Sequence, residues 1–533
     1  MSTIKSLYKG ALALLCLFSC NEGSQNDQAL IKRESMTVSQ MQALTDSNNG
    51  QNKEATDFNT EEYSNIVENN FLSAIENPQS TFSIDVDRAA YSNVRRIIQN
   101  GALPPKGAVR IEEMINYFDY NYTAPTNDDP LNVHTEIASC PWNTKHKLVH
   151  IGLKGKEISK ANLPPANLVF LVDVSGSMDE ANKLPLVRAS MNLLVDQLRD
   201  NDRIAIVVYA GAAGLVLPST KGSDKTKIKE AIGNLQAGGS TAGAEGIKLA
   251  YKIAAENFVK EGNNRVILAT DGDFNVGASS DDELVSLIEE KRKSNIFLTV
   301  LGYGMGNYKD SKMQQLADKG NGNHAYIDNL NEAKKTLVKE FGSTIFTIAK
   351  DVKLQVEFNP AKVKSYRLIG YENRMLAKED FNDDKKDAGE MGAGHTVTAL
   401  YEIIPAGVSD EFTGSVDDLK YQSKPVTKET YGNEMMNIKI RYKEPAGDIS
   451  KLMVQPVVDT NGSWENASEN FRFSSSVAAF GMLLRNSAYK QKASYEAVLS
   501  LAKNSKGNDK DGYRTEFIEL VQTASSLALA KNE

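Results

Sequence analysis

Short apolar runs alternate with helical stripes between residues 167 and 349. The continuous apolar run Leu168–Val172 is typical of a central strand that is covered on both faces. After it comes a helical stripe made of Val187, Met191, Leu194 and Leu198. The alternation continues with strands expected at 203–209, 266–269, 296–301 and 325–327, and with helices expected at 228–235, 244–258, 284–291 and 333–341. This rhythm predicts an α/β domain, in which a doubly wound, mostly parallel sheet carries helices on both faces.

The segments that flank this domain have a different pattern. Residues 131–166 and 350–460 contain runs that are typical of strands, with no helix between them. We therefore expect both segments to form one antiparallel β-sandwich, with the α/β domain at 167–349 inserted between its pieces. Ahead of them, residues 81–130 predict a small α/β module, with a strand at 82–86 and helices at 89–99 and 110–118. Residues 461–533 predict a helical segment, because one stripe carries Val477, Phe480 and Leu484.

The first twenty residues are typical of a secretory signal. Lys5 and Lys9 precede an apolar run at 10–18 that is too short to span a bilayer. The Leu-Phe-Ser-Cys sequence at 17–20 resembles a bacterial lipobox, which implies a signal peptide at 1–19 and a lipidated Cys20. We therefore expect an exported protein of the cell envelope that is lipid-anchored to a bacterial membrane. The alternative is a plain secretory signal with an incidental Cys20.

Residues 20–80 have the composition of a flexible tether. They are rich in Asn, Ser, Gln, Thr, Asp and Glu and contain few aromatic residues. Such a segment cannot bury enough apolar surface to order itself, so we expect it to be disordered and to lift the folded part away from the membrane. A segment that folds on a partner is the alternative.

Length, charge and cysteine content narrow the class further. A chain of 533 residues is too long for one hydrophobic core, so roughly two to four domains are expected. A net charge of −8 without a long Lys/Arg block argues against nucleic acid as a partner. Once Cys16 is removed and Cys20 is lipidated, Cys140 is left as a free thiol. No intrachain disulfide is then possible, and we expect Cys140 to pack in a core.

Oxygen-bearing side chains occupy three loops of the α/β domain, where ligands bind beyond the carboxyl ends of the strands. One apolar strand leads into Asp173-Val-Ser175-Gly-Ser177, a later strand ends at Thr270-Asp271-Gly272, and Gly239-Ser-Thr241 precedes a helix. Hydroxyls and carboxylates without Cys or His suit a hard cation, Mg²⁺ or Mn²⁺.

These three loops resemble the metal-ion-dependent adhesion site of von Willebrand factor type A (VWA) domains, and the likeness spans 167–347. It implies that Ser175 and Ser177 bind the metal through their hydroxyls, and that Thr241 binds directly or through water. It also implies that Asp173 and Asp271 act chiefly through water. Elsewhere the chain resembles bacterial VWA lipoproteins, with motifs at 81–87, 103–105, 109–113, 116–118, 471–473 and 512–514.

The expected function is metal-dependent binding of a protein partner in adhesion or assembly, with an acidic side chain of the partner filling the open position on the cation. A structural envelope protein with a metal site that takes no part in recognition is the alternative. An enzyme is disfavoured. Ser175 lacks the glycine of a nucleophile elbow, and no catalytic or zinc motif contains any of His134, His146, His150, His324 and His395. The glycines at 302–306 predict a flexible turn, and the acidic stretch 380–390 a solvated loop.

Overall fold

The computed structural model describes residues 60–159, 162–239, 243–272, 281–340, 346–413, 432–445 and 447–531, all within one compact unit. The predicted signal peptide, Cys20 and most of the predicted tether lie outside the described residues, and so does Thr241.

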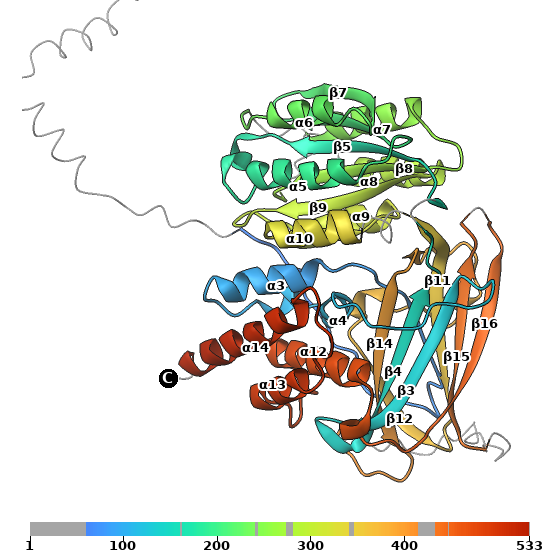
Figure 1. Ribbon diagram of the computed structural model, residues 1–533. Coiled ribbons are helices and arrows are strands. Elements are labelled where there is room, and N and C mark those ends of the chain that lie inside the picture. The colour runs from blue at the N-terminus through green and yellow to red at the C-terminus, as the bar shows by residue number, and fades with distance from the viewer. Residues whose placement is uncertain are drawn as a thin grey trace, which may run out of the picture. The chain divides into compact units, whose positions relative to one another are not determined.

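The α/β domain is built on a six-stranded sheet in the order β10-β9-β8-β5-β6-β7 (Figure 1). In chain order its strands are β5 (Ala166–Asp173), β6 (Arg203–Tyr209), β7 (Ala213–Lys221), β8 (Asn263–Thr270), β9 (Ile296–Tyr303) and β10 (His324–Ile327). Neighbouring strands are parallel except β7, which pairs antiparallel with β6 at the edge. The mostly parallel sheet is thereby confirmed, whereas β7 was not predicted.

Helices cover both faces of this sheet, as predicted. They are α5 (Leu184–Gln197), α6 (Lys225–Gly233), α7 (Gly243–Glu256), α8 (Asp281–Lys293), α9 (Asp310–Lys319) and α10 (Leu330–Lys334), which continues as the π-helix η4 (Lys335–Lys339). Alternate residues of β5 belong to two hydrophobic cores, one on each face of the sheet. Leu168 and Phe170 pack with α5, α6 and α10. Val169 and Leu171 pack with α7, α8 and α9. The apolar run of β5 exists because both of its faces are buried.

Two antiparallel sheets form the predicted sandwich. One has the order β1-β12-β14-β4-β3, with β1 (Leu72–Ser73), β3 (Leu131–Cys140), β4 (Asn143–Gly155), β12 (Val363–Ile369) and β14 (Thr396–Pro405). The other has the order β13-β11-β15-β16, with β11 (Thr347–Phe358), β13 (Gly389–Gly392), β15 (Glu434–Lys443), β16 (Ser450–Val458), and β2 (Gln79–Ser83) also paired to β11. Because β4 precedes the α/β domain and pairs with β14 after it, the insertion is confirmed.

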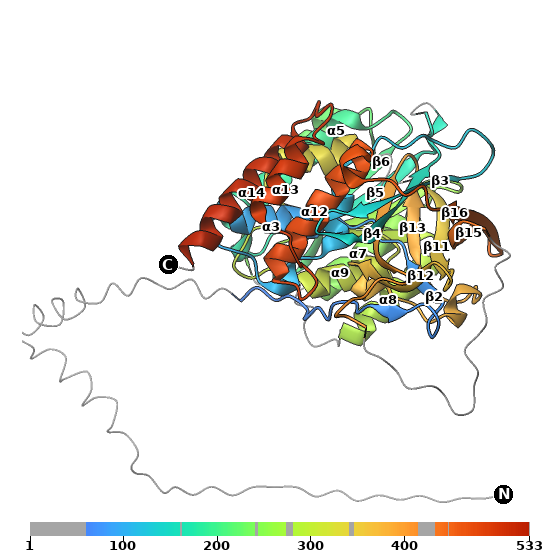
Figure 2. The ribbon, with the colours of Figure 1, turned by 90° about the horizontal axis from the view of Figure 1, so that it is seen from below.

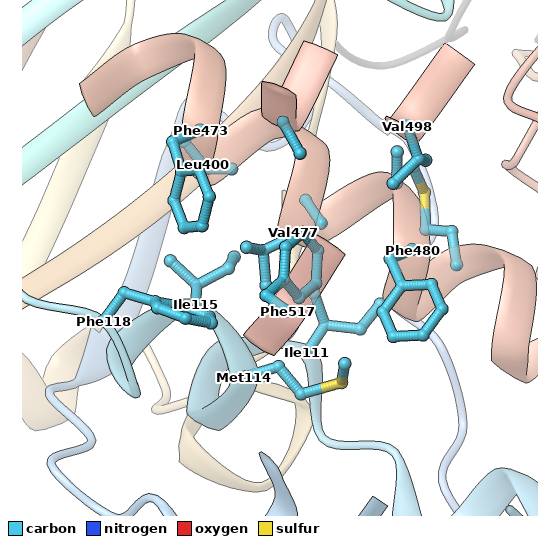
Figure 3. Close-up of a cluster of buried hydrophobic side chains, with 14 of the residues drawn as sticks. Ile111, Met114, Ile115, Phe118, Leu400, Phe473, Val477, Phe480, Val498 and Phe517 are labelled. Atoms are coloured by element: carbon cyan, nitrogen blue, oxygen red, sulfur yellow. The ribbon is translucent and has the colours of Figure 1, made fainter. Parts of the chain in front are cut away.

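Helices from the two ends of the described chain share a third core. They are α3 (Ala89–Gln99), α4 (Ile111–Asn116), α12 (Glu469–Arg485), α13 (Tyr495–Lys503) and α14 (Tyr513–Ala530). Figure 2 shows α3 beside the red helices, and in Figure 3 Phe118 lies among Phe473, Phe517 and their apolar neighbours. The strand of the predicted N-terminal module therefore joins the sandwich, while its helices join the C-terminal segment. No helix among the described residues is both long and apolar enough to cross a bilayer.

The described residues also form short 3-10 turns: η1 (Lys106–Ala108), η3 (Gly176–Asp179), η5 (Glu372–Arg374), η6 (Glu379–Phe381) and η8 (Trp464–Asn466).

The prediction of a disordered tether is wrong for residues 60–80. Phe71 is buried and stacks on Phe412, and β1 and β2 are strands of the sandwich. Glu61 is ion-paired with Arg96 of α3. The composition of this segment is indeed polar. It is ordered nevertheless, because it packs on apolar surface and ion-pairs with side chains that belong to elements distant in the sequence.

Candidate metal-binding site

Parallel pairing brings the predicted loops to one edge of the α/β sheet. Asp173 is the last residue of β5, and Asp271 directly follows β8, its hydrogen-bonded neighbour. Both carboxylates have an exposed fraction of 0%. The turn η3 follows, with Ser175 as its N-cap residue and Ser177 within it. Four of the five predicted ligands therefore lie at one place.

Three hydrogen bonds fix the carboxylate of Asp173. Its Oδ1 accepts from the backbone amide of Ser175 at 2.9 Å, and its Oδ2 accepts from the Tyr209 hydroxyl at 2.9 Å and from Thr270 Oγ1 at 3.2 Å. Burial raises the pKa of Asp173, the nearby charge of Asp271 adds to this, and the hydrogen bonds oppose it. Because its oxygens already accept these hydrogen bonds, the Asp173 carboxylate is suited to bind a metal through a water molecule. Tyr209 and Thr270 are the last residues of β6 and β8, the two strands that flank β5. The sequence interpretation gave neither of them a role.

Two serine hydroxyls form the open part of the site. Ser175 Oγ lies 3.1 Å from Ser177 Oγ. Octahedral Mg²⁺ holds its ligands at about 2.1 Å, so neighbouring ligand oxygens are about 3 Å apart. The spacing of the two hydroxyls therefore fits adjacent positions on such a cation. Ser175 is buried and Ser177 is exposed, so the pair lies at the boundary between the protein and solvent.

The loop that leads to Thr241 is bonded to the first loop. The Gly176 amide donates to the Gly239 carbonyl at 3.0 Å, and the Gly238 amide donates to the Val174 carbonyl at 2.8 Å. Gly239 has a φ of +88°, a conformation that residues with a Cβ rarely adopt. These contacts hold residues 238–239 against the loop that carries the two serines.

Asp271 is held by residues that the sequence interpretation did not assign to the site. Its Oδ2 accepts from Asn307 Nδ2 at 3.0 Å and lies 3.3 Å from Lys183 Nζ. Next to it, Gly272 has a φ of +100°, and a Cβ there would lie 2.7 Å from Tyr308 Cα. The glycine-containing turn at 302–306 therefore leads into a loop that packs on the site.

The donor set fits a hard divalent cation. Two hydroxyls and two buried carboxylates meet without Cys or His, which is the chemistry that Mg²⁺ and Mn²⁺ prefer. Nowhere in the described part of the chain do three or more His, Cys, Asp or Glu side chains gather in a way that could hold a metal. Any metal at this edge would thus depend on Ser175 and Ser177.

The other candidate groups lie elsewhere. Cys140 is a free, buried thiol in the core of the helices, as predicted, and burial raises its pKa. His146 pairs with Glu402 in the sandwich, and His150 bonds to Tyr122. These three side chains are therefore buried and lie away from the candidate metal site.

This fold, with its three loops at the carboxyl edge, defines a VWA domain, and the family model "von Willebrand factor type A domain" matches residues 167–340. The model "von Willebrand factor" matches 57–150, and "Uncharacterized protein YfbK, C-terminal" matches 343–527. The chain belongs to the YfbK family, since it is 42% identical over 476 residues to uncharacterized protein YfbK of Escherichia coli, covering 88% of this chain and 82% of that one.

Further similarities are weaker. Uncharacterized protein sll0103 of Synechocystis sp. is 28% identical over 199 residues, which is 37% of this chain and 46% of that protein. A solved von Willebrand factor type A structure from Catenulispora acidiphila covers 73% of this chain and 90% of its own, at 15% identity and a TM-score of 0.40. VWA domains mediate protein–protein interactions, commonly bind a divalent metal and are typically not catalytic.

Proposed function

We propose that this protein binds a protein partner through a divalent cation, Mg²⁺ or Mn²⁺, in adhesion or assembly at the cell envelope. The observation that carries the proposal is the pair of hydroxyls, Ser175 and Ser177, at the edge where the buried carboxylates of Asp173 and Asp271 meet. Ser175 and Ser177 would bind the ion through their hydroxyls, Thr241 would bind it directly or through water, and Asp173 and Asp271 would act chiefly through water.

The charge of this set favours an acidic ligand. Neutral hydroxyls and carboxylates that act through water leave a divalent cation incompletely neutralised. When bound, the cation supplies a Lewis-acidic position that a carboxylate of the partner can fill. Ser177 is exposed, so such a group can approach from solvent without a rearrangement of the core.

We further propose that the chain is exported with a signal peptide at 1–19 and anchored to a membrane through lipidated Cys20. The support is the lipobox-like sequence at 17–20. Cys20→Ser should move the protein from the membrane to the soluble fraction of fractionated cells. Continued membrane association of the Cys20→Ser chain would refute the anchor and leave the metal site unaffected.

The partner is sought by comparing captures from a detergent extract of cell envelopes. Wild-type protein should retain a partner in Mg²⁺ and release it in EDTA, and Asp173→Ala should retain none. Asp200→Ala is the matched control, because Asp200 is an exposed acid in the loop before β6, at the opposite edge of the sheet. Capture that persists in EDTA and in Asp173→Ala would refute metal-dependent recognition. Metal binding without any metal-dependent capture would favour the structural alternative.

A further inference from the structure

Lys183 places an ammonium group beside a carboxylate of the candidate metal site. Its Nζ lies 3.3 Å from Asp271 Oδ2 and 3.1 Å from Glu180 Oε1. The side chain of Lys183 is only 4% exposed, whereas that of Glu180 is 58% exposed. The site therefore contains a cation that belongs to the protein itself.

The fold determines where this lysine lies. Lys183 immediately precedes α5, where its amide donates to the Glu180 carbonyl and its carbonyl accepts from the Val187 amide, both at 2.9 Å. Its aliphatic stem runs over Gly304 in the loop after β9. A Cβ on Gly304 would lie 2.5 Å from Lys183 Cε, so only glycine leaves room for the stem. The backbone hydrogen bonds of Lys183 and the contact of its stem with Gly304 together direct the ammonium to Asp271.

An ammonium at this position acts against a divalent cation. Both are attracted to the same carboxylate, and two positive charges a few ångströms apart repel each other strongly where water is excluded. With Lys183 present, Asp271 is partly neutralised before any metal enters. The buried charges, those of Lys183, Asp173, Asp271 and a bound divalent metal, then sum to a net positive charge, which attracts the carboxylate of a ligand. The Glu180 carboxylate offsets this charge only weakly, because it is largely exposed and screened by solvent.

The geometry points to Lys183 as the residue that sets metal affinity: it weakens the hold of the site on the cation and strengthens that of the bound cation on an acidic ligand. The inference rests on the proposed function. If Lys183 instead merely joined the start of α5 to β8, its removal would lower stability and leave metal affinity unchanged.

Titration calorimetry with Mn²⁺ and with Mg²⁺ on the chain without its lipid separates these roles. Lys183→Met keeps the length and apolar character of the stem, and should lower the Kd for Mn²⁺ by about tenfold, because the opposing charge is gone. Lys183→Arg keeps the charge and should keep the wild-type Kd. Lys248→Met, an exposed lysine of α7, is the control for the same change of net charge and should leave the Kd unchanged.

Glu180→Gln tests the inference where Lys183→Met does not fold, because Glu180 is largely exposed. Without Glu180 the ammonium is directed to Asp271 alone, and the Kd for Mn²⁺ should rise about threefold. Equal affinity in wild type, Lys183→Met and Glu180→Gln would overturn this inference and leave the proposed function standing. Absence of Mn²⁺ binding to the wild type would overturn both.

Discussion

Asn307 donates a hydrogen bond from its Nδ2 to Oδ2 of Asp271 at a distance of 3.0 Å. This bond joins the loop after β9 to the carboxylate that follows β8. The same loop places Gly304 under Lys183 and Tyr308 against Gly272. The candidate metal site therefore extends beyond the three loops that carry its ligands, to a fourth that orients one of them.

Asn307→Ala should weaken metal binding without unfolding the domain. Loss of the amide donor removes one of the contacts that orient Asp271, and part of the cost of orienting its carboxylate then falls on metal binding. We expect the Kd for Mn²⁺ to rise about threefold to tenfold, which corresponds to a hydrogen bond of about 1 kcal/mol. Calorimetric titration measures this, and an unchanged Kd would show that Asp271 is oriented by other contacts.

Residues 60–62, which precede the strands of the sandwich, form hydrogen bonds with the loop after β9. The Gly306 amide donates to Glu61 Oε1 at 2.9 Å, and the Thr60 and Glu62 amides donate to the Gly306 and Tyr308 carbonyls at 2.7 and 3.0 Å. Burial raises the pKa of Glu61, but bonds to Arg96 and Gly306 outweigh it, and the pKa lies below its ordinary value.

Glu61→Gln should therefore loosen the loop, because the charge that pairs with Arg96 is lost and the contact with Gly306 weakens. Hydrogen exchange of the amides at 304–309 should become faster, by about tenfold for each 1.4 kcal/mol of lost local stability. Amides of β5, in the centre of the sheet, serve as the internal control. Exchange that accelerates equally in both places would mean global destabilisation and would contradict a local role for Glu61.

One buried arginine joins three parts of the chain. Arg95 of α3 is ion-paired with Asp328 after β10 at 2.5 Å, with Glu332 of α10 at 2.8 Å and with Glu516 of α14 at 2.8 Å. Arg95→Met should lower the free energy of unfolding by about 3 to 5 kcal/mol, because it removes the guanidinium that pairs with the buried carboxylates of Asp328 and Glu332.

Urea unfolding measures the loss at Arg95, and Lys229→Met is its comparison. Lys229 pairs with Asp196 at an exposed position, so its removal should cost at most about 1 kcal/mol. Comparable losses in the two variants would contradict the assignment of Arg95 as the link between these segments.

His150 should make the protein less stable in acid. Burial lowers its pKa to about 3, with a further contribution from the charge of His134, so the ring stays neutral in the folded protein while the unfolded chain takes up a proton below about pH 6.5. Its contribution to the free energy of unfolding is therefore lost as the pH falls from 6.5 toward 3, by up to about 1.4 kcal/mol per pH unit.

His150→Gln should lose less stability than the wild type over that range. Comparing the two proteins is necessary, because burial raises the pKa of Glu112 to about 8 and that of Glu113 to about 7, which acts in the opposite direction. These contributions cancel in the difference. Urea midpoints measured from pH 7 to pH 4 give that difference, and parallel curves would contradict the neutral state of His150.

Local signals made the α/β domain predictable. The apolar run of β5 and the helical stripe of α5 indicate their burial without knowledge of the fold. The edge strand β7 was missed because its Leu215 and Val216 are exposed and its pattern does not alternate. The helix α9 was missed because its inward side is narrow, with Met313, Leu316 and Ala317 as its buried apolar residues.

The candidate metal site likewise has a part that the sequence predicts and a part that it does not. Its motif loops, at 173–177, 239–241 and 270–272, are short sequences that the family resemblance identifies. Lys183, Tyr209 and Asn307 reach the site through packing between strands and loops, and nothing in their immediate sequence marks them. The prediction of disorder for residues 60–80 is wrong for a related reason. The contacts that order this segment are with residues more than thirty positions away, as in the pair Glu61–Arg96.

We propose that Asp173, Ser175, Ser177, Thr241 and Asp271 together hold a divalent cation. Calorimetric titration of Mn²⁺ into the wild-type chain, Asp173→Ala and Asp200→Ala tests it most directly. We predict a single saturable site in the wild type, the same site in Asp200→Ala, and a loss of affinity of at least about a hundredfold in Asp173→Ala. No Mn²⁺ binding to the wild type, or equal binding by all three proteins, would contradict a metal site at these residues.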